Sequence, residues 1–575
     1  MNIQDLQAET NAIYHEIAQM ESGEAQDIVK KIFNLIERLA SDKSSLEAEL
    51  QQLRDEVNRL KGEQGKPNIK PNKNNKDKDK DDDISSEDER KKAELDAQKE
   101  TDNNSENTDS NKKKRRRKSK RSKIKIDRTQ ICSFDKTGLP DDLIPKGYDE
   151  LVIQDIIIKT NNIKYQLPVY YSPSENKRYR AELPEGVRGQ GEFGIGIRSL
   201  IPMLKMMGVT EKPIVGFFEN IGIVVSPTYV SQQWTGGYDW AHQEKSDLYR
   251  SGIINSDYGQ IDDTSARVNG DNHYCQVVCN DLFTAYFTTK NKDRLSVLDV
   301  LTDYAPRHYI YNQQTQALLD EFKLADKARA KFDAQIPVDT VMNEEQFSAH
   351  LACLNTLGVR QTTHVTEACA IAYYQQQTEF PVIETLLADD APQFKLLTEH
   401  LGLCWVHDGR HYKKLRPILE IYQQTLADFR GHYWEYYKEL LKYQKNPCPD
   451  KKAWLLTRFD ELFATTTDYD DLNDRIAKTL AKKTELLRVL ELPHLPLHNN
   501  AAELGARKQA RTRDISFQTR NEKGTKIKDS FMSLAETAKK LGVSFYDYVY
   551  DRVSGEFKMP SMADVIAQKA QSLPA

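Results

Sequence analysis

The chain has 575 residues, more than one hydrophobic core accommodates, because single cores stop growing at about 250–300 residues. Charged residues make up 29% and hydrophobic residues 38%, a polar composition that indicates segments without a packed core. No run approaches the ~18 apolar residues of a membrane span, and the N-terminus has no apolar signal region, which excludes an integral membrane protein and argues against secretion. Seven dispersed cysteines are typical of a reducing compartment, so we expect a cytoplasmic protein.

Charge is segregated along the chain, although the net charge is only −5. Lys112–Arg128 holds twelve basic residues against one acid, whereas Asp77–Glu89 holds eight acids against two lysines. A mildly acidic body that carries one dense basic block favours a polyanionic partner. The alternative is a solvated linker, and composition does not separate the two.

Residues 1–62 are predicted to be a helical oligomerisation region, because apolar residues follow a heptad pattern over residues 29–60. The series with a spacing of seven consists of Ile32, Leu39, Leu46, Leu53 and Leu60. The pattern favours pairing with a second helix, and the alternative is one long helix packed on its own body. Residues 63–130 contain few apolar side chains and are predicted to be a disordered linker, with the basic block at 112–128.

Residues 131–250 are predicted to combine short strands with helices. The alternating, Ile-rich and Tyr-rich stretch Glu150–Tyr171 indicates strands. Gly196–Met207, Lys212–Asn220 and Ser226–Trp234 indicate three short helices, which fit either a helix-turn-helix or an ordinary helical connector.

Residues 251–515 are predicted to form a mixed α/β unit. We expect three sequential strands, with an Asn269-Gly270 turn, at Gln260–Thr264, Tyr274–Asn280 and Phe283–Thr289. A helix follows at Arg294–Leu301, then an apolar strand at Val382–Leu387 and another short apolar run at Leu403–Val406. Helical patterns near 312–379 and 412–492 indicate inserted helical modules, and residues 516–575 form a helical tail.

Carboxylates follow two of these strands and open one helix. Asp262-Asp263 ends the first strand, Asp389-Asp390 follows a later one, and Glu503 comes after Asn499-Asn500. Three such carboxylates could converge and hold two Mg²⁺ ions for an in-line phosphoryl displacement. Acidic pairs at strand ends are also common in loops, and because strand side chains alternate, only one acid of Asp262-Asp263 can face a site.

Five blocks in this order resemble the insertion-sequence-66 family of bacterial transposases. They are Ile261-Asp262-Asp263-Thr264 with Val268-Asn269-Gly270-Asp271-Asn272, Asp389-Asp390-Ala391-Pro392-Gln393-Phe394, Leu403-Cys404-Trp405-Val406-His407 with Arg410, Asn499-Asn500-Ala501-Ala502-Glu503 with Arg507 and Arg513, and Leu534–Tyr548. The resemblance implies a ribonuclease-H-like DDE core with helical insertions that cleaves and joins DNA. It implies Asp262, Asp389 and Glu503 as catalytic metal ligands for two Mg²⁺ or Mn²⁺ ions.

The resemblance also implies partners and supporting residues. We expect binding to element ends and target DNA in the bacterial nucleoid, self-association through residues 29–60, and accessory proteins of the same element. Expected DNA contacts are Lys112, Lys113, Lys114, Arg115, Arg116, Arg117, Lys118, Arg410, Arg507, Lys508, Arg511 and Arg513. Expected site-supporting residues are His407, Asn499 and Asn500.

The chain departs from the family pattern at a few positions. Asp263 stands where the family usually has Glu, Asp390 where it usually has Gly, and Leu504 where it usually has Arg. The family often carries a Cys-rich zinc element before its core, but that region retains only Cys132, so we expect no zinc there. Two other readings stay open: a catalytically decayed transposase that only binds DNA, and a structure-specific nuclease without strand transfer.

The spacing of Cys404, His407 and His411 would give three zinc ligands, with no fourth evident. A structural cysteine beside a site-supporting histidine is the simpler interpretation. Cys275 and Cys279 lie on one face of a predicted strand and are expected in the core.

Overall fold

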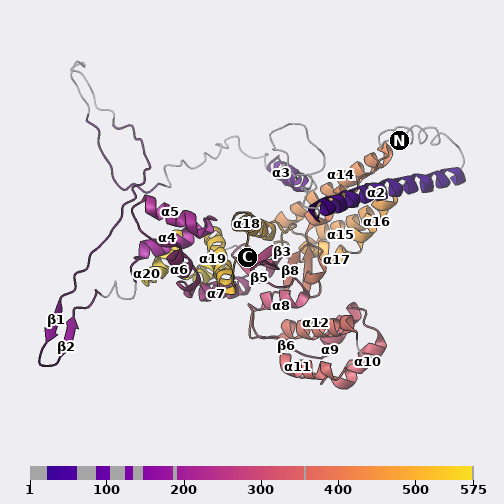
Figure 1. Cartoon of the computed structure of the whole chain (residues 1–575). Helices are drawn as coiled ribbons and strands as arrows, with labels where there is room; N and C mark the ends of the chain where they lie inside the picture. Colours follow the sequence, from indigo (N-terminus) through magenta and orange to yellow (C-terminus); the bar gives the residue numbers. More distant parts are fainter. Residues whose placement is uncertain are drawn as a thin grey trace, which may run out of the picture.

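The computed structural model describes residues 23–60, 86–103, 124–133, 147–184, 191–354 and 358–572. Helices surround a central mixed sheet (Figure 1), which confirms the predicted α/β class. Within these ranges, no helix is both long enough and apolar enough to cross a membrane.

Five strands form the central sheet, in the order β5-β4-β3-β8-β9. They are β3 (Tyr258–Val268), β4 (Asp271–Cys279), β5 (Thr284–Thr289), β8 (Thr385–Ala388) and β9 (His400–Leu403). The first three are antiparallel, whereas β8 pairs in parallel with both β3 and β9. Asn269 and Gly270 both have positive φ, +50° and +89°, as a tight hairpin turn with right-handed twist requires.

The two faces of the sheet pack against different helices, because side chains alternate along a strand. Ile261 and Val278 face a large core that includes α7 (Trp240–Ile254) and α8 (Arg294–Leu301). Val277 faces the other way and packs with Ala506 of α18. Cys275 and Cys279 are buried, as predicted for core residues.

Two helical modules occupy the ranges where helical patterns were predicted, the first between β5 and β8 and the second between β9 and α18. The first contains β6 (His308–Tyr309), α9 (Gln313–Glu321), α10 (Asp326–Gln335), β7 (Met342–Asn343), α11 (Glu344–Ala352) and α12 (Val359–Gln376). The second follows α13 (Trp405–Lys413) and contains α14 (Glu420–Lys445), α15 (Pro449–Phe463), α16 (Asp470–Leu480) and α17 (Lys483–Leu486). Short 3₁₀ turns occur at η3 (Pro392–Phe394) and η4 (Arg488–Leu490).

The C-terminal segment is helical, as predicted. It contains α18 (Asn500–Ser516), α19 (Glu522–Leu541), α20 (Phe545–Ser554) and α21 (Met562–Gln571). Helix α19 packs along β5 and also contacts α7, so the tail completes the body that carries the site.

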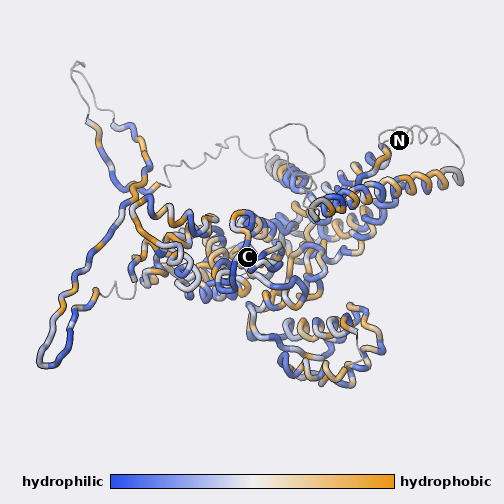
Figure 2. Tube along the Cα trace, viewed as in Figure 1, coloured by the Kyte–Doolittle hydropathy of each residue, from blue (hydrophilic) through white to orange (hydrophobic). Residues whose placement is uncertain are grey.

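Helix α2 (Gly23–Leu60) is continuous over the heptad region, and its two halves differ in their surroundings. Near its start, Phe33 is buried against the second helical module, and the Glu37 carboxylate accepts hydrogen bonds from the backbone N–H groups of Ile418 and Leu419. Further along, Leu46 and Leu53 are 63% and 66% exposed. Apolar residues nevertheless continue along this outer half (Figure 2). The start of α2 thus packs on its own body, and the predicted pairing with a second helix concerns only its exposed part around Leu46 and Leu53.

The region before the core differs partly from the prediction. The three predicted helices are present as α4 (Ile195–Met206), α5 (Glu211–Asn220) and α6 (Pro227–Gly236), packed around a small core of their own. The predicted strands over residues 150–168 are absent from the described structure. Only the hairpin of β1 (Val169–Ser172) and β2 (Lys177–Arg180) forms, because the earlier alternating residues have no neighbouring strand with which to bond.

A helix also lies inside the linker predicted to be disordered. Helix α3 (Glu87–Asn103) packs on α14 and buries Ala93 and Ala97, which are 4% and 1% exposed. Two alanines spaced by four residues form a flat stripe that allows close packing on a neighbouring helix. That short stripe contributes little to an average of hydrophobicity over the segment, which is why composition alone predicted disorder.

Candidate active site

Asp262 and Asp389 lie at the same level on two neighbouring strands. Strands β3 and β8 pair with Gln260 opposite Leu387, and each aspartate follows its residue by two positions. Asp262 lies opposite Val277 of β4, on the sheet face that α18 covers. The parallel pairing therefore brings together two acids that are 127 positions apart in the sequence.

Each acidic pair has one member held elsewhere by polar partners. Asp263 accepts a hydrogen bond of 2.8 Å from the amide of Gln393. Asp390 forms ion pairs with Lys482 and, at 2.7 Å, with Lys395. Asp263 and Asp390 thus have polar partners of their own, and the family resemblance implies the other member of each pair, Asp262 and Asp389, for the site.

Glu503 reaches the same site from the first turn of α18. Asn499, the residue just before α18, is fully buried and donates a hydrogen bond of 2.7 Å from Nδ2 to the carbonyl oxygen of Ile261. Its backbone N–H donates to Cys404 Sγ at 3.2 Å. Asn499 thus ties the start of α18 to the backbone immediately before Asp262, the supporting role predicted for it.

Close packing also fixes the height of α18 above the sheet. A Cβ atom added at Gly505 would lie 2.7 Å from Cγ1 of Val277, closer than real Cβ contacts. The hydroxyl of Tyr286 donates to the carbonyl oxygen of Gly505 at 3.3 Å. Glycine at this position therefore lets the helix that carries Glu503 approach β4.

The three carboxylates act on one another electrostatically. Burial, followed by the negative charges of Asp389 and Glu503, raises the pKa of Asp262 from 3.8 to about 7. A shift of this size and cause marks a buried group of like charges, such as functional sites often contain. Hard cations such as Mg²⁺ prefer carboxylate oxygens, so this donor set fits divalent cations.

A second group of side chains surrounds the Glu503 carboxylate. Arg410 donates to Glu503 Oε2 at 3.0 Å and lies 2.9 Å from Nε2 of His407, and His407 Nδ1 lies 3.5 Å from Glu503 Oε1. Burial lowers the pKa of His407, so the ring is neutral near pH 7. His407 therefore contacts the predicted metal ligand Glu503, and Arg410, for which DNA contact was predicted, is also a partner of Glu503 in this structure.

Cys404, His407 and Glu503 have ligand atoms within 4.8 Å of one another, close enough for one ion. In this group Glu503 stands in place of His411, which the sequence spacing had suggested. Burial raises the pKa of the Cys404 thiol to about 12, and the Arg410 guanidinium adds positive charge next to Glu503. Both effects oppose a cation at this position.

The predicted DNA contacts on α18 divide into two sets. Arg507 and Arg511 are exposed and share one helix face. Lys508 donates to the carbonyl oxygen of Met206 in α4, and Arg513 donates to the carbonyl oxygen of Ser265 at 2.7 Å. The first set can reach a ligand, whereas the second holds α18 to its neighbours.

Other predicted residues lie outside the acid cluster or outside the described structure. The basic residues Lys112, Lys113, Lys114, Arg115, Arg116, Arg117 and Lys118 fall outside the described residues. Asn500 is the first residue of α18, and its backbone N–H lies 3.4 Å from Nδ1 of His498. His498 in turn lies 3.7 Å from Glu94 of α3, so the acidic helix borders the site.

Sequence reasoning missed two of these features, namely helix α3 beside the site and the lysines that hold Asp390. The local signals for the helix were the stripe of Ala93 and Ala97 and the three acids at 87–89 in its first turn. Lys482 comes from the second helical module, 92 positions from Asp390, and no local pattern marks that pairing.

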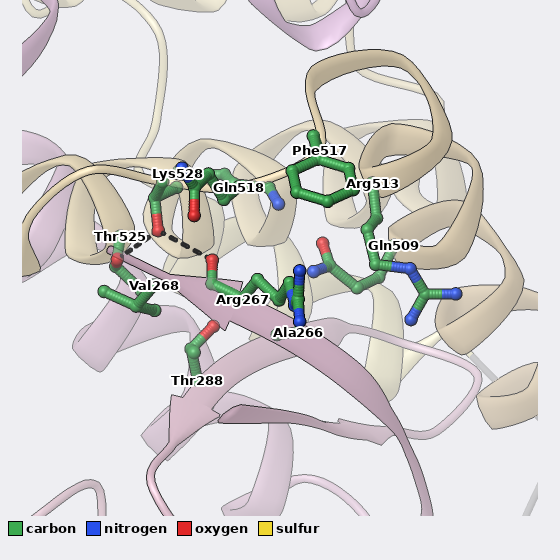
Figure 3. A pocket seen from close by; sticks show the side chains of 11 residues that line it. Ala266, Arg267, Val268, Thr288, Gln509, Arg513, Phe517, Gln518, Thr525 and Lys528 are labelled. Carbon is green, nitrogen blue, oxygen red and sulfur yellow. Dashed lines mark hydrogen bonds between the residues drawn. The ribbon is translucent and has the colours of Figure 1, made fainter. Parts of the chain in front are cut away.

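A small cavity lies apart from the acids, beyond the far end of β3. It is lined by Arg267, Gln509 and Lys528, among others, where β3 meets α18 and α19 (Figure 3). Its volume of about 10 Å³ corresponds to about one water molecule. Its size and position suit packing between these elements, and none of the three acids lines it.

No protein-family model matches the chain. One curated relative, the uncharacterized protein y4jO of Sinorhizobium fredii (strain NBRC 101917 / NGR234), is 30% identical over 326 residues. That match covers 56% of this chain and the whole of the relative.

Proposed function

The chain belongs to the same family as the uncharacterized protein y4jO of Sinorhizobium fredii, and from its site geometry we propose that it is a DDE transposase. It would bind the ends of a bacterial insertion sequence, cleave the DNA strand there and join it to target DNA. The observation that carries this proposal is the convergence of Asp262, Asp389 and Glu503 from three separate parts of the chain.

The order of the central sheet supports a ribonuclease-H-like core. Counted along the chain, the strands lie in the order third, second, first, fourth, fifth, with the first three antiparallel. The first strand carries Asp262, and Asp389 follows directly after the fourth, β8.

The residues of the site have distinct proposed roles. When bound, two Mg²⁺ or Mn²⁺ ions would stabilise the attacking and leaving oxygens of an in-line phosphoryl displacement. Asp262, Asp389 and Glu503 would hold these ions. Arg410 and His407 would orient the Glu503 carboxylate through the contacts described above. The proposed two-metal displacement needs no covalent link between protein and DNA.

Other parts of the chain would bring the DNA to this site. Arg507 and Arg511 present two exposed guanidinium groups beside the acids, which suits sequence-independent contact with phosphates. Helices α4–α6 would read the end sequence, and the basic block would bind backbone. The exposed apolar face of α2 around Leu46 and Leu53 would pair two protomers, because two element ends must be held together. Accessory proteins of the same element would act with it.

The test is cleavage of a labelled duplex that carries the element's own end, with and without Mg²⁺. Asp389→Ala should abolish nicking, whereas Asp390→Ala should retain it, because the lysine pairs hold Asp390 away from the site. Duplex binding should persist in both variants. Full cleavage by Asp389→Ala would refute the acid triad.

The same assay separates the alternatives. Specific binding without nicking by wild type, after the products of neighbouring genes have been added, would indicate a decayed transposase that only binds DNA. Nicking without any joined product in a strand-transfer assay would indicate a nuclease on the same fold.

A further inference from the structure

Helix α3 places acidic side chains over a cationic surface next to the candidate site. Glu89 forms an ion pair with Arg430 of α14, and its other oxygen lies 4.0 Å from Lys413 of α13. Arg430 and Lys413 are only 28% and 22% exposed under this cover. We call these two residues, together with the adjoining Arg410, the α3-covered surface.

The electrostatic interactions of Glu87 in α3 reach residues that border the acid cluster. Burial raises the pKa of Glu87, but hydrogen bonds from Arg90 and the charges of Arg90, His498 and Arg410 outweigh burial and lower it. Arg410 is the residue that donates to Glu503. An acidic helix beside three mutually repelling carboxylates is unfavourable unless cations lie between them, and the α3-covered surface supplies those cations.

Helix α3 contacts the body through apolar and charged side chains, and Glu94 lies 3.7 Å from His498 in addition to the Glu89 ion pair. Ala93 and Ala97 lie on the buried side of the helix, and Arg90 forms ion pairs with Glu87 and Glu94 of the same helix. Two alanine side chains bury little apolar area, so charged contacts such as the Glu89 ion pair contribute to the attachment. A stronger anion that competes for the same cations can therefore displace the helix.

The chemistry of the covered cations identifies that competitor. A guanidinium donates hydrogen bonds to a carboxylate and to a phosphate in the same geometry. Glu89 therefore binds Arg430 in the way that a backbone phosphate would. The surface includes Arg410, which donates a hydrogen bond to Glu503, one of the acids proposed to act on a phosphodiester. In the sequence, Lys112 opens the basic block nine positions after Asn103, the last residue of α3.

We propose that the α3-covered surface binds the phosphate backbone of DNA and that α3 is its intramolecular occupant, displaced when DNA binds. This inference rests on the proposed function, because it takes the ligand of the adjacent site to be DNA. The apparent affinity for DNA is then lowered by the fraction of molecules in which α3 is docked. Loosening α3 raises that affinity, and removing the cations below it does not.

The experiment measures equilibrium binding of a fluorescent duplex to the full chain in a chelator, so that cleavage has no influence. Glu89→Gln breaks the ion pair, and Asp88→Asn removes the same charge from the exposed residue next to it. We expect Glu89→Gln to bind the duplex about threefold to tenfold more tightly than Asp88→Asn does. Circular dichroism verifies that both variants are folded.

Arg430→Gln is the second variant, because it breaks the same ion pair from the other side. It should bind DNA no more tightly than wild type, since the phosphate partner is lost with the pair. In wild type, the backbone amides of α3 should exchange hydrogen faster once duplex is added.

Three results would overturn the inference: equal affinities of Glu89→Gln and Asp88→Asn, α3 amides that stay protected with DNA bound, or no duplex binding by any variant. Failure of the proposed catalysis is a separate outcome. A chain whose binding responds to Glu89→Gln but which never nicks DNA keeps this inference and contradicts the transposase.

Discussion

Replacing Asp262 by asparagine tests whether the acids form one mutually repelling cluster. Burial, Asp389 and Glu503 raise the pKa of Asp262 from 3.8 to about 7, so the folded chain holds this proton more tightly than the unfolded chain. The free energy of unfolding therefore falls as pH rises from about 4 to about 7 and stays lowered above that range. A difference of about three pH units corresponds to about 4 kcal/mol at most.

The asparagine variant removes this charge and keeps the local geometry. Its side-chain oxygen can still accept the hydrogen bond of 2.9 Å from the backbone N–H of Asp263. In a chelator, the variant should be more stable than wild type, and its advantage should widen by about 3 kcal/mol between pH 5 and pH 8. Asp263→Asn is the matched control, because Gln393 already holds that carboxylate apart.

Urea denaturation at the two pH values measures the difference. Excess Mg²⁺ at pH 8 should reduce the advantage, because cations that bind the folded wild type stabilise it by mass action. An advantage independent of pH, or a wild type that is the more stable protein at pH 8 without metal, would refute the repelling cluster.

Three further predictions concern packing, DNA contact and assembly. Gly505→Ala should cost about 1–3 kcal/mol of stability and reduce nicking, because the added Cβ has no room, whereas Gly431→Ala in α14 meets open space and should be neutral or stabilising by urea denaturation. Arg507→Ala should weaken binding of every duplex alike and lower the slope of log affinity against log salt by about 1 in anisotropy titrations. Replacing Leu46 and Leu53 together by serine should shift sedimentation towards the monomer without changing the melting temperature of the body, since both side chains are exposed in the protomer.

The sequence alone predicted the elements that local patterns encode. Alternating residues and the Asn269-Gly270 turn predicted the β3–β4 hairpin, because strand alternation and left-handed turn residues are local properties. Helical spacing predicted α8, which begins at Arg294 as expected, and the structure adds Asp293 as its N-terminal cap. The candidate acids were also found in the sequence, but two of them, Asp262 and Asp389, as members of pairs.

The family resemblance implies the first member of each pair, and the tertiary structure gives a physical reason that local patterns do not contain. Asp390 is held by Lys395 and Lys482, and the second lysine comes from a helical module that no local pattern connects to the strand. Asp262 faces α18 because β3 pairs with both β4 and β8 in a register set by the whole sheet.

The difference between local patterns and contacts between distant residues also explains the predictions that were wrong and the features that were missed. The residues over 150–168 alternate like strands, yet a strand forms only where a partner offers backbone hydrogen bonds. Helix α3 is polar like a linker, yet Ala93 and Ala97 fit the surface of α14. Local sequence determined the elements and the candidate acids, whereas pairing, packing and ion pairs between distant residues decided which acids converge and what covers the surface beside them, because those energies depend on contacts that the sequence order does not show.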